Sequence, residues 1–320
     1  MDVADFVIDP SRLSPDESQW EAPLAFVELA AVYDGDIPPV RLPPCPTIGL
    51  GDPAHPLASM LDTVLEASVS ADLVASQVLA NPLAAATVVQ LLRMIPDMSL
   101  EAALTAESMA YAMLQGSSEH RGWRRRQEPS SGAPVPEGVI DLEREGPVLV
   151  ITLDRPAAGN AIDRPMRDGL YEAFALGAAD DEIERIMLRG RGKTFSLGAD
   201  LMEFGTTIDP VLAHDIRMRI LPARQAIRCA HKIDVHAGGA CIGAGLELAA
   251  FAARFTAAPN AWFQLPELAM GILPGAGGCV SLTRRLGRQR AALMILSGKR
   301  LSARQALAWG LIDAIVDEPA

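Results

Sequence analysis

Cysteine is scarce in this sequence and follows no recognisable pattern. The four cysteines among 320 residues, Cys45, Cys229, Cys241 and Cys279, show neither CxxC nor CxxH spacing. Zinc sites and disulfide frameworks depend on paired or regularly spaced cysteines. The sequence therefore predicts reduced thiols, a cytoplasmic location and no metal site.

Positive charge is also in short supply, because 28 Lys and Arg stand against 40 Asp and Glu, a formal net charge of −12. Binding to nucleic acid or to an anionic membrane needs a surplus of basic surface. The acidic start MDVADFVIDP has no signal-peptide pattern, and polar residues interrupt the most apolar stretch, 71–95. We expect a soluble protein whose partners include neither nucleic acid nor a membrane.

The chain divides by composition into four segments. Residues 1–55 are rich in proline and predict an irregular arm with one short strand at PTIGLG. Residues 56–126 carry apolar side chains at helical spacing, which predicts a helical domain. A Pro-, Gly- and Ser-rich linker at 127–138 follows. Beyond it, residues 139–320 alternate strand-like runs with helical stretches, which predicts an α/β layered core.

Two glycine-rich turns stand out in the α/β segment. They read GKTFSLGADL at 192–201 and GGACIGAGLELAAFAA at 238–253, the second leading into a helical pattern. The first turn of a helix has free N–H groups, and small residues let an anionic oxygen approach them. The alternative is that the glycines only make tight turns and close packing.

Two glutamates lie among apolar neighbours. Glu247 follows the glycines of the second turn, and Glu267 lies in WFQLPELAMGILPGAGG. Desolvation favours the protonated form of a carboxyl group, so a pair in different environments can divide acid and base work. Each glutamate alone also has a structural interpretation, such as interaction with a helix dipole.

These motifs together resemble the enoyl-CoA hydratase/isomerase family, also called the crotonases. From about residue 139 to the end, ITLDRPAAGNAI, FSLGADL, GACIGAGLELAAFAARF, QLPELAMGILPGAGG and SGKRLSARQALAWGLIDAIV occur in the family's order and spacing. The resemblance implies an α/β fold, a crotonase-like spiral of repeated ββα units plus an all-α helical segment. It also implies an enzyme that acts on acyl-CoA thioesters.

The resemblance assigns roles residue by residue. The backbone N–H groups of Ala199 and Ala244 match the oxyanion hole, although glycine is usual at the second position. Glu247 and Glu267 match the glutamates that hold water and move protons when a hydratase adds water to a 2-enoyl-CoA. Coenzyme A is then part of the substrate, so neither a separate cofactor nor a metal is expected.

The same resemblance places coenzyme A contacts. Gly198, Asp200 and Leu201 belong to the loop expected to contact coenzyme A, and Trp123 and Arg126 match an aromatic and a basic residue of the family's helical tail. For Trp123 and Arg126 the alternative is a solvated helix end.

The order of the segments departs from the family. Crotonases usually continue beyond the segment matching WGLIDAIV into a helical tail that builds trimers, whereas here 56–126 resembles that tail. We therefore predict a circular permutation with 127–138 joining the old ends, because domain termini commonly lie close together. An unrelated helical extension is the alternative. A homotrimer or homohexamer is expected by resemblance alone.

A second departure is IDVH at 233–236, where the family has an apolar strand. Asp234 and His236 share one strand face, as a satisfied pair, an exposed edge or an extra titratable group near the pocket. The presence of both glutamates ranks a hydratase first. An isomerase or other crotonase-type acyl-CoA enzyme and a non-catalytic acyl-CoA-binding paralogue are the alternatives, and the acyl group is not specified.

Overall fold

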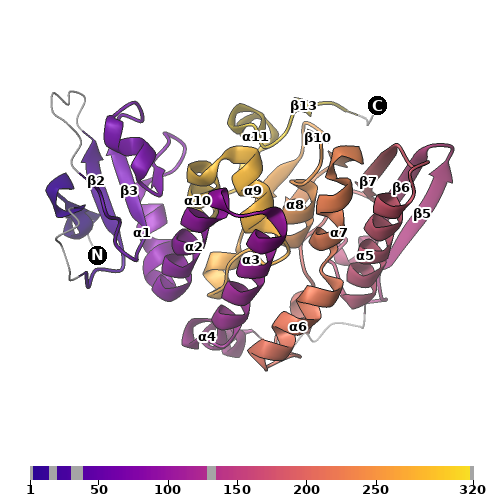
Figure 1. The fold of residues 1–320 in the computed structure, drawn as a ribbon, viewed down its shortest axis with the longest axis horizontal. Coiled ribbons are helices and arrows are strands. Elements are labelled where there is room, and N and C mark those ends of the chain that lie inside the picture. The colour runs from indigo at the N-terminus through magenta and orange to yellow at the C-terminus, as the bar shows by residue number, and fades with distance from the viewer. Residues whose placement is uncertain (1–2, 14–19, 30–38, 128–134, 318–320) are drawn as a thin grey trace.

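The computed structural model describes residues 3–13, 20–29, 39–127 and 135–317. A small sheet lies at one end, a large sheet at the other, and the helical segment lies between them (Figure 1). The large sheet has the strand order β13-β10-β8-β7-β6-β5, and within it β5 alone runs antiparallel to its neighbour. Its strands are β5 (Val139–Glu145), β6 (Val148–Asp154), β7 (Arg185–Gly190), β8 (Ile233–Ala237), β10 (Arg254–Ala257) and β13 (Ala314–Ile315).

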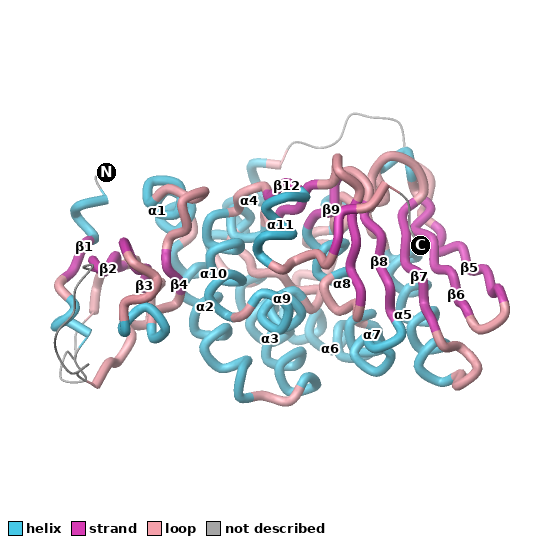
Figure 2. The backbone as a smooth tube through the Cα atoms, turned by 90° about the horizontal axis from the view of Figure 1, so that it is seen from above, coloured by secondary structure: helices cyan, strands magenta, loops and turns pink. Residues whose placement is uncertain are grey.

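Successive units of the chain give one strand to the large sheet and the next to a three-stranded sheet of order β12-β11-β9. β8 is followed by β9 (Ala240–Ile242) and α8 (Gly243–Ala249), and β10 is followed by β11 (Trp262–Gln264). The remaining elements are β12 (Leu301–Ser302), α5 (Arg164–Ala179), α6 (Pro210–Ile220), α7 (Pro222–Cys229), α9 (Gly278–Leu286), α10 (Arg288–Ser297) and α11 (Ala303–Trp309). The repeated strand, strand, helix order is the predicted spiral, seen from above in Figure 2.

The helical segment consists of α1 (Ala71–Ala80), α2 (Pro82–Met94), α3 (Leu100–Gln115) and α4 (Ser118–Arg126). Ser70 and Ser99 stand immediately before the first residues of α1 and α3. Their side chains accept backbone N–H groups of the first helical turn and so cap the two helices. α1 and α2 pack on α10, and α3 packs on α6 and α9. From Ala71 onward this part of the chain is helical, as expected, whereas residues 56–70 of the predicted helical domain contain a 3-10 turn, Pro56–Met60, and a short strand, Thr63–Val64.

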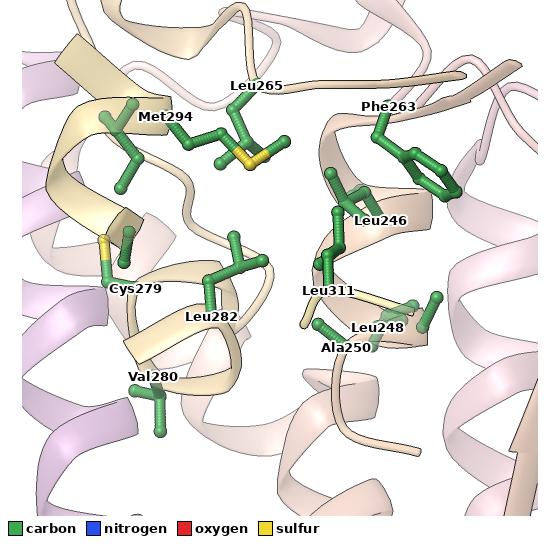
Figure 3. Packing of buried hydrophobic residues seen from close by; sticks show 14 of the residues in the cluster. Leu246, Leu248, Ala250, Phe263, Leu265, Cys279, Val280, Leu282, Met294 and Leu311 are labelled. Carbon is green, nitrogen blue, oxygen red and sulfur yellow. The ribbon is translucent and has the colours of Figure 1, made fainter. Parts of the chain in front are cut away.

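One hydrophobic cluster joins the helical segment to the α/β segment. It includes Val88 of α2, Leu104 of α3 and buried residues of α8, α9 and α10. Figure 3 shows part of the α/β side of this cluster, with Leu248, Leu282 and Met294 among the labelled side chains. The linker at 127–138 therefore separates two stretches of sequence that share a core. That the helical segment is a permuted tail stays a prediction.

The N-terminal segment differs from the expected irregular arm. β1 (Val7–Ile8), β2 (Ala25–Leu29), β3 (Thr47–Gly51) and β4 (Thr63–Val64) form a parallel sheet in that order. Only β3, in PTIGLG, was predicted. The other strands are short and pair across long proline-rich connections, so no local alternation or turn signals them.

Asp62 ties this small sheet to the helices. Its buried carboxylate pairs with Arg93 of α2 at 2.6 Å and with Arg288 of α10 at 3.5 Å, and it accepts the Thr47 N–H at 2.9 Å. The sheet is thereby fixed to both the helical segment and the α/β segment.

Among the described residues, no single helix is long and apolar enough to cross a membrane. Only α1 and the segment Pro82–Asp97 taken together reach that length and apolar character, and they are bent by 108° at their junction.

Candidate active site

A cavity of about 620 Å³ lies between the helical segment and the α/β segment. Its wall is built from α3, α6, α8, the loop after β7 and the turn after β11. Both predicted glutamates and both predicted amide residues lie on this wall, namely Ala199, Ala244, Glu247 and Glu267. The structure therefore brings together residues that are up to 68 positions apart in the chain.

Glu247 is held by backbone amides. It lies in α8 with 2% of its surface exposed, and its Oε2 accepts the N–H groups of Ala276 at 2.6 Å and Gly278 at 2.9 Å. Burial raises the pKa of Glu247 to about 7, although the two N–H groups oppose the rise. This carboxyl group therefore changes charge near neutral pH.

Glu267 has a different environment. It follows β11 at the start of a short 3-10 turn, Glu267–Met270, and is 8% exposed. Its Oε2 is buried and has no hydrogen-bond partner among the described residues. Burial, followed by the charge of Glu247, raises the pKa of Glu267 well above its usual range. The two carboxyl groups thus differ in their partners, because Glu247 accepts two N–H bonds that favour its anion, whereas Oε2 of Glu267 has no donor among the described residues to stabilise a charge.

Gly243 makes room for Glu267. The residue has φ +46°, and a Cβ built on it would lie 2.6 Å from Oε1 of Glu267. A side chain at this position would clash with the carboxyl group and strain the backbone. Glycine at the start of α8 is therefore required by the site.

Ala199 and Ala244 line the cavity from two adjoining turns. Gly198, with φ +90°, brings these turns together, since a Cβ at this glycine would lie 3.5 Å from the Ala244 nitrogen. Neither the Ala199 N–H nor the Ala244 N–H has an acceptor among the described residues. Two free donors on one wall suit an anionic oxygen.

The sequence analysis missed Glu107 of α3. Its Oε1 accepts the Gly277 N–H at 2.7 Å, and its Oε2 accepts those of Cys279 at 2.9 Å and Val280 at 3.4 Å. Glu107 is fully buried; burial and the charge of Glu247 raise its pKa, and the three amides oppose the rise. In the sequence, Glu107 is only one glutamate in a helical stretch. The backbone N–H groups that it accepts lie about 170 residues further along the chain, so nothing local marks it.

Tyr111, one turn further along α3, also escaped prediction. It lies on the cavity wall against Gly275, where a Cβ would be 2.1 Å from Cδ2 of the ring. Burial raises the pKa of Tyr111, and the nearby charge of Arg217 opposes the rise. The helical segment thus supplies part of the site.

The residues expected to contact coenzyme A are only partly gathered at the cavity. Asp200 lines it and pairs with Arg155 at 2.7 Å, whereas Leu201 is exposed beside it. Trp123 lies against Phe204 of the wall, with ring centroids 5.9 Å apart. Arg126 is exposed and is not on the described wall.

Another arginine of α4 lies closer to the wall than Arg126. A Cβ on Gly205, which lines the cavity, would overlap the guanidinium of Arg124. Arg124 is therefore the arginine of α4 that packs on the cavity wall. Consecutive arginines look alike in the sequence, so their spacing could not show that Arg124, and not Arg126, contacts the cavity wall.

Asp234 and His236 have partners outside the cavity. Asp234 pairs with Arg185 at 2.6 Å, and Nδ1 of His236 lies 3.1 Å from Oγ1 of Thr256. Neither residue is on the cavity wall. Of the three interpretations of this strand face, the structure favours a satisfied set of polar contacts.

The layers and the cavity define an α/β protein with the architecture of an acid–base enzyme, and comparison with known proteins gives its family. A model of the enoyl-CoA hydratase/isomerase family matches residues 143–320. The 2,3-dehydroadipyl-CoA hydratase of Escherichia coli (strain K12) is 34% identical over 174 residues, 54% of this chain and 68% of that protein. The carnitinyl-CoA dehydratase of Salmonella enteritidis PT4 (strain P125109) is 36% identical over 181 residues, 56% of this chain and 68% of that protein.

A solved structure agrees. The enoyl-CoA hydratase from Thermoplasma volcanium GSS1 matches with a TM-score of 0.51 and 36% identity, covering 56% of this chain and 72% of that chain. The chain belongs to the enoyl-CoA hydratase/isomerase family. It has the predicted crotonase-like fold and is an enzyme of the general acyl-CoA hydratase type, a lyase.

Proposed function

We propose that the protein adds water across the double bond of a 2-enoyl-CoA thioester. The observation that carries the proposal is a single cavity with two buried carboxyl groups in different environments and two free backbone N–H groups. The named relatives act on different acyl-CoA substrates, so they support the reaction class and leave the acyl group open.

The two glutamates divide the proton transfers. Glu247, whose pKa is about 7 and whose anion is held by two N–H groups, accepts a proton from the attacking water. The water oxygen bonds to C3, and the electron pair of the double bond moves toward the thioester carbonyl. Protonated Glu267 then gives its proton to C2, which completes the addition.

The charge that develops on the thioester oxygen needs stabilisation at the moment it forms. We assign this role to the N–H groups of Ala199 and Ala244, because both residues line the cavity and neither N–H has an acceptor among the described residues. Loss of one such donor typically lowers kcat by about 10²–10³-fold. Because both donors are main-chain groups, alanine at position 244 supplies the same N–H as the glycine that is usual in the family.

Coenzyme A would approach along the wall that contains Asp200 and Phe204. Gly198, Leu201 and Trp123 stay our proposed contacts on this side, and Arg124 joins Arg126 as a basic residue to test. No separate cofactor or metal takes part in the proposed reaction. Assembly as a homotrimer or homohexamer and a cytoplasmic location stay predictions.

The test is a panel of 2-enoyl-CoA thioesters with short, long and aryl acyl groups, followed by loss of the conjugated enoyl absorbance. We expect Glu247→Gln and Glu267→Gln each to abolish consumption, while Asp234→Asn, outside the cavity, leaves it unchanged. Activity that survives in Glu247→Gln, with double-bond migration as the product, would assign an isomerase instead. Thioester binding without consumption of any member would assign a binding protein.

A further inference from the structure

Arg217 of α6 places a positive charge on the cavity wall. Its Nε donates to Oγ of Ser108 at 3.1 Å, and its Nη atoms donate to Oε1 of Gln115 at 3.3 Å and to the Ser108 carbonyl at 3.4 Å. Its guanidinium also lies over the ring of Tyr111, 4.4 Å from the centroid. All of these partners are neutral.

The other described cations of the wall differ in this respect. Arg164 pairs with Glu203, and Arg167 pairs with Asp168. Within the described part of the chain, Arg217 has no carboxylate at ion-pair distance, and one of its two Nη1 hydrogens has no acceptor. A half-buried charge without a counter-ion is costly unless a ligand provides one.

The surroundings of Arg217 fit the acyl part of a substrate. The same helix gives Ala213, Ile216 and Ile220 to the wall, which makes this side of the cavity aliphatic. Tyr111 contacts both the guanidinium and Gly275, which adjoins the turn that holds Glu247. An aliphatic chain that starts between the glutamates would therefore run past apolar side chains toward a cation.

We propose that Arg217 binds a carboxylate at the far end of the acyl group, so that the substrate is a 2-enoyl-CoA whose chain ends in a second carboxylate. A guanidinium offers two parallel N–H donors to a carboxylate. The two bonds from Arg217 to Oε1 of Gln115 are both 3.3 Å long, and the substrate carboxylate would replace this neutral acceptor. Ser108 Oγ, which also lies 2.9 Å from Nδ1 of His214, holds Nε in place. The inference rests on the proposed hydratase function.

The test compares pairs of thioesters of equal chain length, one ending in a carboxylate and one in a methyl group. Saturated pairs are titrated by calorimetry, so binding is read without catalysis, and 2-enoyl pairs are assayed for hydration. We expect the carboxylate member of the best-fitting length to bind about tenfold more tightly or better, a preference lost in Arg217→Gln and reduced but not abolished in Arg217→Lys, which keeps the charge without the two parallel donors.

The possible failures are distinguishable. Hydration of methyl-ended substrates with no carboxylate preference in wild type would overturn the role of Arg217 and leave the hydratase intact. An equal loss of affinity for both members in Arg217→Gln would assign the guanidinium to a phosphate of coenzyme A instead. Binding preference without hydration of any member would overturn the proposed reaction alone. If Arg217→Gln does not fold, the comparison of carboxylate-ended with methyl-ended thioesters in wild type and in Arg217→Lys still tests the proposal.

Discussion

Glu107 and Glu247 bind alternating backbone N–H groups of one turn. Glu247 accepts those of Ala276 and Gly278, and Glu107 accepts those of Gly277, Cys279 and Val280. The two carboxyl groups therefore bind the same stretch of backbone at the start of α9. A change in one of them alters the position of the other through the turn they share.

Glu107→Ala tests this arrangement, because it leaves three buried N–H groups without acceptors. We expect the free energy of unfolding to fall by about 1–3 kcal/mol or more and kcat to fall as the Glu247 partners shift. Urea unfolding and enoyl-CoA assays measure the two effects. Glu101→Gln, exposed on the same helix, is the matched control. Wild-type stability in Glu107→Ala would show that these bonds contribute little.

Stability should depend on the ionisation of Glu267. Its folded pKa is raised, so its contribution to stability is fully present below the unfolded pKa of about 4.3 and is lost as pH rises through the folded value. We expect Glu267→Gln to be more stable than wild type at pH about 8 by about 1 kcal/mol or more, and equal to it near pH about 4. Thermal unfolding across this range measures the difference. A pH-independent difference would contradict the raised pKa.

Gly243→Ala should damage the site more than the fold. The added methyl group would meet Oε1 of Glu267 at 2.6 Å, and φ +46° adds strain of about 1–2 kcal/mol. We expect kcat to fall by up to about a hundredfold, because a small displacement of a catalytic group is enough. Gly310→Ala, with φ +81° and no atom within 4 Å of its Cβ, is the control for strain alone. Equal activities of the two variants would show that Glu267 tolerates the contact.

Asp62→Asn should loosen the small N-terminal sheet. The carboxylate is 1% exposed and is shared by Arg93 and Arg288, so its neutralisation leaves both cations poorly paired. We expect a loss of about 3–5 kcal/mol in the free energy of unfolding. Chemical denaturation measures it, with Asp97→Asn, an exposed carboxylate, as control. A change no larger than that of the control would show that the sheet contributes independently of this ion pair.

Much of the α/β segment could be predicted from sequence because its signals are local. The glycine turns, the apolar neighbours of Glu247 and Glu267 and the strand runs each occupy a few consecutive residues. The N-terminal parallel sheet was missed because its pairing crosses long connections. Glu107, Tyr111 and Arg217 were missed because what distinguishes them is the element packed against each, and local sequence does not carry that information.

The distance along the chain between Glu107 and the turn whose N–H groups it accepts matters for how the protein folds during synthesis. α3 leaves the ribosome about 170 residues before the amides that Glu107 binds have been made. Until α9 and α10 emerge, the apolar surfaces of α2 and α3 that these two helices cover have no partner, and the Glu107 carboxylate lacks the N–H groups that it binds. Nascent chains of this protein should therefore depend on chaperone protection until late in translation, and the active site would be among the last features to form.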